Sequence, residues 1–180
     1  MIGTSTLLNN DSLLLSNFDI NWNNDSSSLN TSFKIYEDLT RVYSDRYQYI
    51  YPDFKYIKII EIPNNYNGNF DFSSYGYNKN YNTNINESVL TNDFLFSSNE
   101  YVTSNGISTN YDLLLKNSNS YSNNSITFDN NANYNLYSTL KIDTSLPLQK
   151  KINEYIHYLK PVASIRYSPN GNKNISDKDI

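Results

Sequence analysis

His157 is the only imidazole in the sequence, and the chain contains no cysteine. A general base needs a nucleophile or a water to deprotonate and a partner that orients its ring. No residues of these types lie at a recognisable spacing from His157, so we interpret it as a surface or interface residue. Zinc sites built from cysteine and histidine are excluded by the same counts. We therefore expect no catalytic, metal-binding or cofactor-binding residue and no cofactor.

The carboxylates occur in pairs but form no catalytic or calcium-binding motif. Glu37 and Asp38 are adjacent, and Asp177 and Asp179 lie in the C-terminal tail. The tail pair lacks the glycine and the glutamate of a helix-loop-helix calcium site. The sequence also has no phosphate-binding glycine loop, dinucleotide fingerprint or nucleophile elbow. These absences predict a protein that is not an enzyme.

A basic and aromatic stretch is the one feature that could contact nucleic acid. Arg41, Arg46, Lys55 and Lys58 are interleaved with tyrosines, a combination that can stack bases on a sheet. The formal net charge is -4, however, and the sequence pI is about 4.9. An acidic chain is poorly suited to a phosphate backbone. We interpret the stretch as the polar face of an amphipathic strand and expect no nucleic-acid partner.

The composition of the 180 residues indicates an ordered chain with a thin core. Hydrophobic residues make up 38%, below the usual share, while aromatic residues reach 15% and include 18 tyrosines. Disordered chains usually lack aromatic residues and carry a high net charge. Abundant Asn, Tyr, Ile and Lys with few Arg, Gly and Ala point to an AT-rich genome. The tyrosines therefore reflect either codon bias or selection for interfaces.

The N-terminal 30 residues read as an arm. Leucine patches at 7–8 and 13–15 stand in an Asn/Ser background, which suits either a segment that packs on a neighbouring subunit or a loosely ordered terminus. No apolar run reaches the length of a transmembrane helix, and the first residues lack the basic region of a secretory signal. We therefore expect no membrane partner.

The middle of the chain predicts one helix followed by short strands. Phe33, Tyr36, Leu39 and Val42 lie close to a helical spacing, which predicts a helix over 32–44. The alternating and β-branched runs that follow predict strands. The Asn/Tyr-rich segment 63–88 reads as a long loop or an irregular hairpin, with a turn signal at Asn67-Gly68. The predicted strands cover 47–51, 54–62, 89–96, 100–103, 111–115, 125–128 and 134–142.

The clearest local unit is a predicted helix, turn and strand over 145–167. Leu148, Ile152, Ile156 and Leu159 form an apolar helical face, and Pro161 ends the helix. Residues 162–167 then read as a strand. The fold class predicted is α+β, with an arm at 1–30, a single β-rich domain at 31–168 and a polar tail at 169–180.

Residues 151–167 of this unit, KINEYIHYLKPVASIRY, resemble a helix, Lys-Pro and strand arrangement that recurs in tail and baseplate proteins of tailed bacteriophages. The resemblance covers this segment alone. It implies an assembly role and no catalytic residue.

Together these observations predict a non-enzymatic structural component of a phage virion, in the tail, baseplate or head–tail connector. Its partners would be other virion proteins and further copies of itself. One alternative is an accessory subunit of an organellar assembly, such as a mitochondrial ribosome or respiratory complex, located in the mitochondrion. Another is a carbohydrate-binding or adhesin β module that uses Tyr and Asn as sugar contacts. The candidate interface residues are Leu13, Leu14, Tyr66, Tyr75, Tyr77 and Tyr81, and the candidate core residues are Ile57, Ile59, Leu140, Ile152, Ile156 and Leu159.

Overall fold

The computed structural model describes residues 12–42, 45–63, 67–82 and 84–169. The described chain is an all-β antiparallel fold with essentially no helix. The predicted α+β class is therefore wrong. The strands are β1 (Leu13–Asn23), β2 (Ser27–Asp38), β3 (Tyr47–Ile60), β4 (Gly68–Tyr81), β5 (Ile85–Ser98), β6 (Tyr101–Val102), β7 (Ser108–Asn123), β8 (Asn133–Ser145), β9 (Leu148–Ile152), β10 (Tyr155–Leu159) and β11 (Val162–Tyr167).

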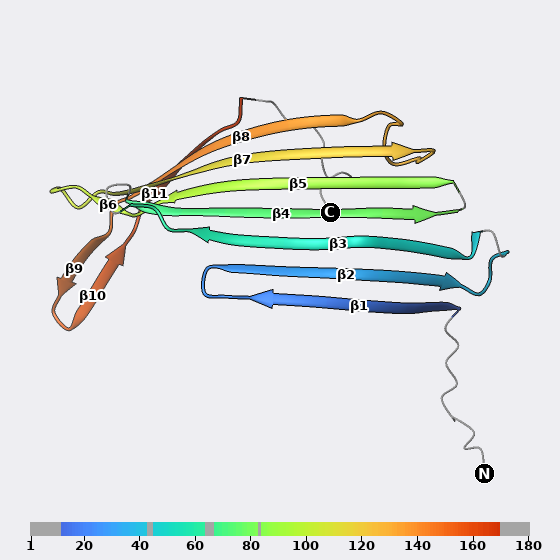
Figure 1. Ribbon diagram of the computed structural model, residues 1–180. Coiled ribbons are helices and arrows are strands. Elements are labelled where there is room, and N and C mark those ends of the chain that lie inside the picture. The colour runs from blue at the N-terminus through green and yellow to red at the C-terminus, as the bar shows by residue number, and fades with distance from the viewer. Residues whose placement is uncertain (1–11, 43–44, 64–66, 83, 170–180) are drawn as a thin grey trace, which may run out of the picture.

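Most strands follow one another as a meander in a single sheet. The order is β1-β2-β3-β4-β5-β7-β8-β11, with β6 paired to β7, and β9 and β10 form a separate hairpin (Figure 1). Every pairing is antiparallel between strands that are close in sequence, as short connections allow. The outermost strands of this order are β1, with 11 residues, and β11, with 6 residues, which borders only Leu140–Ser145 of β8.

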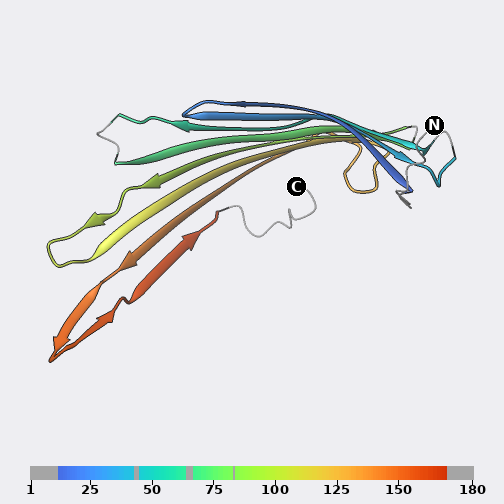
Figure 2. The ribbon, with the colours of Figure 1, turned by 90° about the horizontal axis from the view of Figure 1, so that it is seen from below.

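The sheet is a curved single layer (Figure 2). Successive side chains of a strand point to opposite faces, so the register assigns each residue to a convex or a concave face. The loop 124–132 folds over the concave face (Figure 2), and the Ser122 hydroxyl donates to the carbonyl of Phe128 in this loop at 3.0 Å. Ser122 therefore faces the concave side. Leu113, an odd number of positions away in β7, faces the convex side together with its register partner Phe96 and the next partner, Phe70.

The described part of the chain has one small buried core, and it lies on the concave face. It consists of Tyr77, Val89 and Phe128, with Ile50 and Tyr75 packed against it. Tyr77 and Val89 are register partners in β4 and β5, while Phe128 comes from the loop 124–132. The core thus exists because the β7–β8 connection folds back onto the sheet.

The predicted helix over 32–44 is instead the end of β2 and the turn that follows it. Phe33 and Ile35 also alternate with Lys34 and Tyr36, and this period of two is the one the chain adopts. A register shift between Ser32 and Lys34 adds a bulge to the strand.

The predicted C-terminal helix is the β9–β10 hairpin. Ile152 pairs with Tyr155 across a two-residue turn, and Asn153 takes a φ of 56°. Asparagine tolerates this left-handed conformation, which two-residue hairpin turns require. The predicted strand at 162–167 is confirmed as β11.

The segment predicted as a long loop, 63–88, contains β4 and the start of β5. Phe70 and Phe72 alternate with Asn69, Asp71 and Ser73, which is the pattern of a strand with two different faces. The predicted strand at 125–128 lies in the loop over the concave face. Residues 13–30, predicted as an arm, form β1 and the first part of β2, and residues 1–11 lie outside the described ranges.

Candidate functional site

The structure assembles no recognisable catalytic centre in the ranges that it describes. His157 lies in β10, where its side chain is exposed. Those ranges also contain no group of three or more side chains that could hold a metal ion. The features that stand out are a polar cleft at one end of the sheet, a buried carboxylate beside it, and a convex face that divides into an apolar and a polar part.

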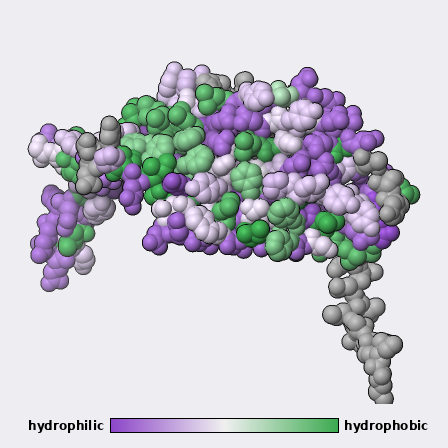
Figure 3. Space-filling model, in the orientation of Figure 1, coloured by the Kyte–Doolittle hydropathy of each residue, from purple (hydrophilic) through white to green (hydrophobic). Residues whose placement is uncertain are grey.

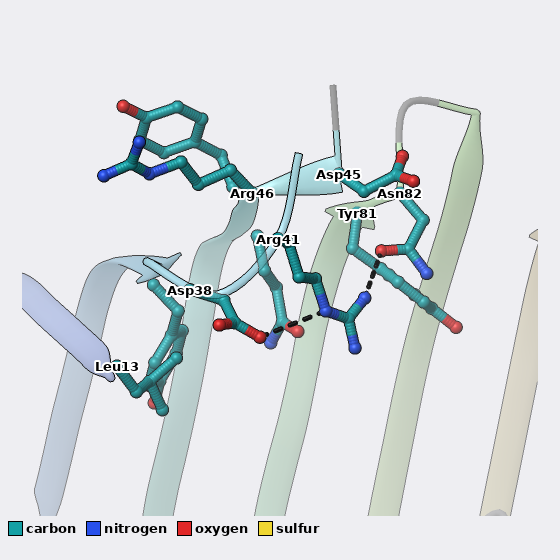
Figure 4. A pocket seen from close by; sticks show the side chains of 10 residues that line it. Leu13, Asp38, Arg41, Asp45, Arg46, Tyr81 and Asn82 are labelled. Carbon is teal, nitrogen blue, oxygen red and sulfur yellow. Dashed lines mark hydrogen bonds and ion pairs between the residues drawn. The ribbon is translucent and has the colours of Figure 1, made fainter. Parts of the chain in front are cut away.

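The polar cleft lies where the β2–β3 and β4–β5 connections meet. It is a cavity of about 260 Å³ whose lining includes Asp38, Arg41, Asp45, Arg46 and Asn82 (Figure 4). Arg41 points into this space toward Asn82, whereas the Arg46 side chain points away from it (Figure 4). We call this cavity the rim cleft.

Arg41 links the two connections that form the rim cleft. Its Nε donates to Asp38 Oδ2 at 3.0 Å, and its Nη1 donates to Asn82 Oδ1 at 3.0 Å (Figure 4). Asn82 adopts a φ of 46° at the end of β4, a conformation that asparagine tolerates in turns. A side chain from the β2–β3 turn thus fixes the neighbouring β4–β5 turn.

Asp38 is held by three donors. The Thr40 hydroxyl and the Thr40 amide donate to its Oδ1 at 2.6 Å and 3.0 Å, and Arg41 occupies the other oxygen. The hydrogen bonds from Thr40, followed by the charge of Arg41, lower the pKa of Asp38 below its ordinary value. The carboxylate is therefore ionised and oriented before any ligand arrives.

The second arginine of the rim cleft pairs with Glu37. Arg46 Nε lies 2.8 Å from Glu37 Oε1, at an angle that makes it an ion pair without a hydrogen bond. The Tyr47 hydroxyl donates to the same Glu37 oxygen at 3.1 Å. Both arginines are thus neutralised by carboxylates of β2.

A buried carboxylate on the concave face anchors the loop 124–132. Glu87 is 3% exposed, and its Oε1 accepts hydrogen bonds from the hydroxyls of Tyr81 and Ser125 at 2.8 Å and 2.6 Å. Lys79 Nζ lies 3.8 Å from the other oxygen. Burial and the hydrogen bond to Glu87 raise the pKa of Tyr81, so its hydroxyl remains a donor. The carboxylate thereby ties β4, β5 and the loop together.

An unbroken row of apolar residues crosses the convex face at the end of the sheet nearest β6. Each member is the register partner of the next, and the six members come from six neighbouring strands: Ile60, Phe70, Phe96, Leu113, Leu140 and Tyr167. Phe72, Phe94 and Leu115 flank this row on the same face, and the Phe72 and Phe94 rings are 4.7 Å apart. We call the row and these three flanking residues the apolar region (Figure 3).

The middle of the convex face carries hydrogen-bonded amides and hydroxyls. Ser74 donates to Asn92, and Asn92 donates to Asn117 at 3.4 Å. Asn117 and Asn119 exchange side-chain hydrogen bonds with each other. The same strands that are apolar at one end are therefore polar further along their length.

The predicted interface residues lie on three different parts of the molecule. Leu13 and Leu14 are exposed on β1, while Tyr75 is half-buried and Tyr77 is buried on the concave face. Tyr81 lines the rim cleft. Tyr66 lies outside the described residues.

The predicted core residues are exposed, which corrects the expected position of the core. Ile57 and Ile59 belong to β3 and Leu140 to β8, and no second layer formed by the described residues covers them. Ile152, Ile156 and Leu159 belong to the β9–β10 hairpin, where Ile156 is 63% exposed. The expected packing of a helix against the sheet is absent because this segment is a hairpin.

Sequence reasoning missed the rim cleft and the role of Glu87. No sequence pattern indicates that Asp38 and Asn82 lie close together, because their proximity depends on two turns at the same end of the meander. No helix within the described residues is long and apolar enough to cross a membrane. No protein-family model and no curated protein matches the sequence.

Proposed function

We propose that this chain is a non-enzymatic structural sheet that borders a lipid layer, with its apolar region against hydrocarbon and its concave face against water. The observation that carries the proposal is the row of six apolar residues on the convex face. Leu113 and Leu140 in this row are 39% and 36% exposed. Burial of such a surface is favourable by about 25 cal/mol per Å² of apolar area, so it needs a covering medium.

Hydrocarbon fits the apolar region because it requires no complementary shape and no hydrogen bonds. Neighbouring strands are about 4.8 Å apart, so a row across six strands is roughly 24 Å wide. Monomeric soluble proteins rarely expose apolar patches as broad as this. The strands β2, β4, β5 and β7 are each paired with a neighbour on both sides, as a lipid environment demands.

The concave face carries charged pairs beside its small core. Lys34 Nζ lies 2.6 Å from Asp53 Oδ2, and Lys116 Nζ lies 3.6 Å from Asp93 Oδ2. These charges share one face of the sheet, which suits contact with water. Alternation of apolar and polar residues along strands is typical of sheets that separate lipid from water.

The polar middle of the convex face limits how much of each strand would lie in hydrocarbon. A strand of 14 residues such as β4 is about 46 Å long, whereas the hydrocarbon core of a bilayer is about 30 Å thick. We infer that the amide-rich part, which includes Asn92 and Asn117, lies outside the hydrocarbon. One end of each strand would be embedded and the other end would face water.

The edges of the sheet imply further strands in the working assembly. The Ser12 carbonyl accepts from the Leu39 amide, and the Asn24 amide donates to the Ser27 carbonyl. Even-numbered residues of β1 therefore pair with β2, and the amides and carbonyls of odd-numbered residues face the open edge. A lipid layer would not tolerate these open groups, so we expect this edge to pair with another strand.

The test is lipid binding by the full chain, with a tryptophan introduced into the apolar region as the reporter. Trp22, the only natural tryptophan, is linked by register through Leu29, Tyr56 and Ser74 to Asn92, so it lies level with the amide-rich part. We therefore use Phe94→Trp, at a position 38% exposed in the apolar region, together with Trp22→Phe. With phosphatidylcholine vesicles we expect co-flotation, a blue shift of the introduced tryptophan's emission and quenching by brominated lipid. Leu115→Asp should abolish co-flotation, whereas Leu90→Asp should retain it. The two leucines are matched, being 40% and 38% exposed on the same face, but Leu90 lies in the polar part.

The virion role predicted from the sequence remains a proposal and shares the structural, non-enzymatic part of this one. In a virion, protein rather than lipid would cover the apolar region. A discrete homo-oligomer in lipid-free solution, with the emission of the tryptophan introduced at position 94 unchanged by vesicles, would contradict the lipid proposal and favour the virion.

A further inference from the structure

We propose that the rim cleft binds one ring of a neutral sugar, with Arg41 and Asn82 as the principal polar contacts. This inference goes beyond the lipid-bordering role and does not depend on it. The cleft is separate from the apolar region and is built from different side chains.

The size of the cavity indicates a small ligand. Sites for drug-sized molecules usually have volumes of about 300–1,000 Å³. The rim cleft, at about 260 Å³, falls just below that range. It therefore suits a single ring with its substituents.

The charge of the lining indicates a neutral ligand. The two arginines are balanced by acidic partners, because Arg41 pairs with Asp38 and Arg46 pairs with Glu37. A phosphate bound to Arg41 would have to compete with Asp38, and a metal ion bound to Asp38 would have to displace Arg41. A hydroxyl group has no such conflict, because it both donates to carboxylates and accepts from guanidinium groups.

The polar groups of the cleft are fixed in advance and retain unused capacity. A guanidinium has five N–H donors, and the contacts to Asp38 and Asn82 use one Nε–H and one Nη1–H of Arg41. The Arg41 side chain is 51% exposed, so its other donors are accessible to a ligand. The Asn82 carboxamide accepts from Arg41 and still has two N–H donors. Preorganised groups of this kind reduce the entropy lost on binding.

The remaining lining supplies the apolar surface that a sugar ring needs. Tyr36, Tyr47 and Tyr81 line the cleft together with Leu13. A pyranose has a face of C–H groups and a rim of hydroxyls, so aromatic and aliphatic surfaces complement its face while polar side chains bind its rim. The Tyr81 ring is held in place by its hydrogen bond to Glu87.

The experiment is a titration of the full chain, in detergent solution without lipid, with galactose, mannose and N-acetylglucosamine. Ligand-observed NMR and calorimetry measure binding, and inorganic phosphate is titrated in parallel. We expect at least one sugar to bind with a dissociation constant on the order of 1 mM. Arg41→Ala and Asn82→Gly should each weaken that binding about tenfold, the effect of one lost charged or polar contact. Glycine is chosen at 82 because it accepts the positive φ.

The control is Arg166→Ala, which removes an exposed arginine from β11 and should leave sugar binding unchanged. Circular dichroism of each variant shows whether the sheet is retained. Asn82→Gly keeps the proposal testable if Arg41→Ala does not fold. The proposal is overturned if none of the three sugars binds, if the variants bind as tightly as the parent chain, or if phosphate binds in preference. None of these results would alter the vesicle experiment, so the two proposals fail separately.

Discussion

The hydroxyl of Ser125 donates a 2.6 Å hydrogen bond to the carboxylate of Glu87, although the two residues are 38 positions apart. Ser125 belongs to the loop 124–132 and Glu87 to β5. This contact holds the loop against the concave face and covers a carboxylate that is 3% exposed. A curved single-layer sheet thereby obtains its small core from a connection rather than from a second layer.

The first prediction concerns the apolar anchor of this loop. Phe128 is 5% exposed in the core with Tyr77 and Val89, so Phe128→Ala should lower the free energy of unfolding by about 2–4 kcal/mol. Ile126, in the same loop, is 99% exposed, and Ile126→Ala should change it by less than about 0.5 kcal/mol. Denaturant titration of both variants measures the difference. Equal effects would show that the loop is not seated on the sheet as described.

The second prediction concerns the polar anchor. Ser125→Ala removes one of the two hydroxyl donors to Glu87 and should cost about 1–2 kcal/mol, because a buried carboxylate loses a hydrogen bond. Asn131→Ala, at an exposed position of the same loop, is the control. Urea titration should reproduce this order. A Ser125→Ala variant as stable as the control would mean that Glu87 is satisfied without the loop.

The sequence predicted several strands correctly, yet it gave the wrong fold class, and one ambiguity explains why. Ile152 and Ile156 are four positions apart, which fits a helical face but also a hairpin in which they belong to different strands. The choice depends on the turn, where Asn153 adopts a positive φ. Short apolar runs cannot distinguish these alternatives by spacing alone.

The position of the core depends on contacts between distant segments, so it was not readable from local patterns. Leu140 and Ile57 are apolar, as core residues are, but no other described element packs over them, and both are 36% exposed. Phe128 stands in an Asn/Ser-rich loop and is nevertheless buried. The expectation that no membrane is involved stays a prediction; it rests on the length of apolar runs and on the lack of a basic region at the N-terminus.

A third prediction follows from the burial of Tyr77. Burial is the main cause that raises the pKa of this phenol in the folded chain. The contribution of Tyr77 to stability is therefore complete at pH values below the pKa of tyrosine in the unfolded chain, about 10. It is lost as the pH rises toward the higher pKa of Tyr77 in the folded chain. Tyr77→Phe should reduce the loss of stability between about pH 10 and pH 12. Tyr155→Phe, at a position 73% exposed, should leave that loss unchanged. Denaturant titrations across this pH range would detect the difference.

The fourth prediction concerns acid. The hydrogen bonds from Thr40 and the charge of Arg41 lower the pKa of Asp38. The stabilisation from these contacts is therefore complete at pH values above the pKa of aspartate in the unfolded chain, about 4. It is lost as the pH falls through the lower pKa of Asp38 in the folded chain. The amide proton of Thr40, which donates to Asp38 Oδ1, should therefore shift in NMR spectra below about pH 4. Asp38→Asn should abolish this titration. A Thr40 shift that persists in the variant would assign it to another group.

The last prediction separates two kinds of glycine. A Cβ at Gly76 would lie 2.8 Å from Phe54 Cε1 and 2.9 Å from the carbonyl oxygen of Val89, so Gly76→Ala should cost about 1–3 kcal/mol through overpacking. A Cβ at Gly106 would meet only Leu146 Cδ1 at an ordinary contact distance of 4.0 Å, but the φ is +79°, so Gly106→Ala should cost about 1 kcal/mol through backbone strain. Asparagine tolerates that conformation, and Gly106→Asn should therefore recover part of the loss. Gly76→Asn should lower the free energy of unfolding more than Gly76→Ala does, because the larger side chain would clash more with Phe54 and Val89. If asparagine rescued both positions in denaturant titrations, crowding at Gly76 would be refuted.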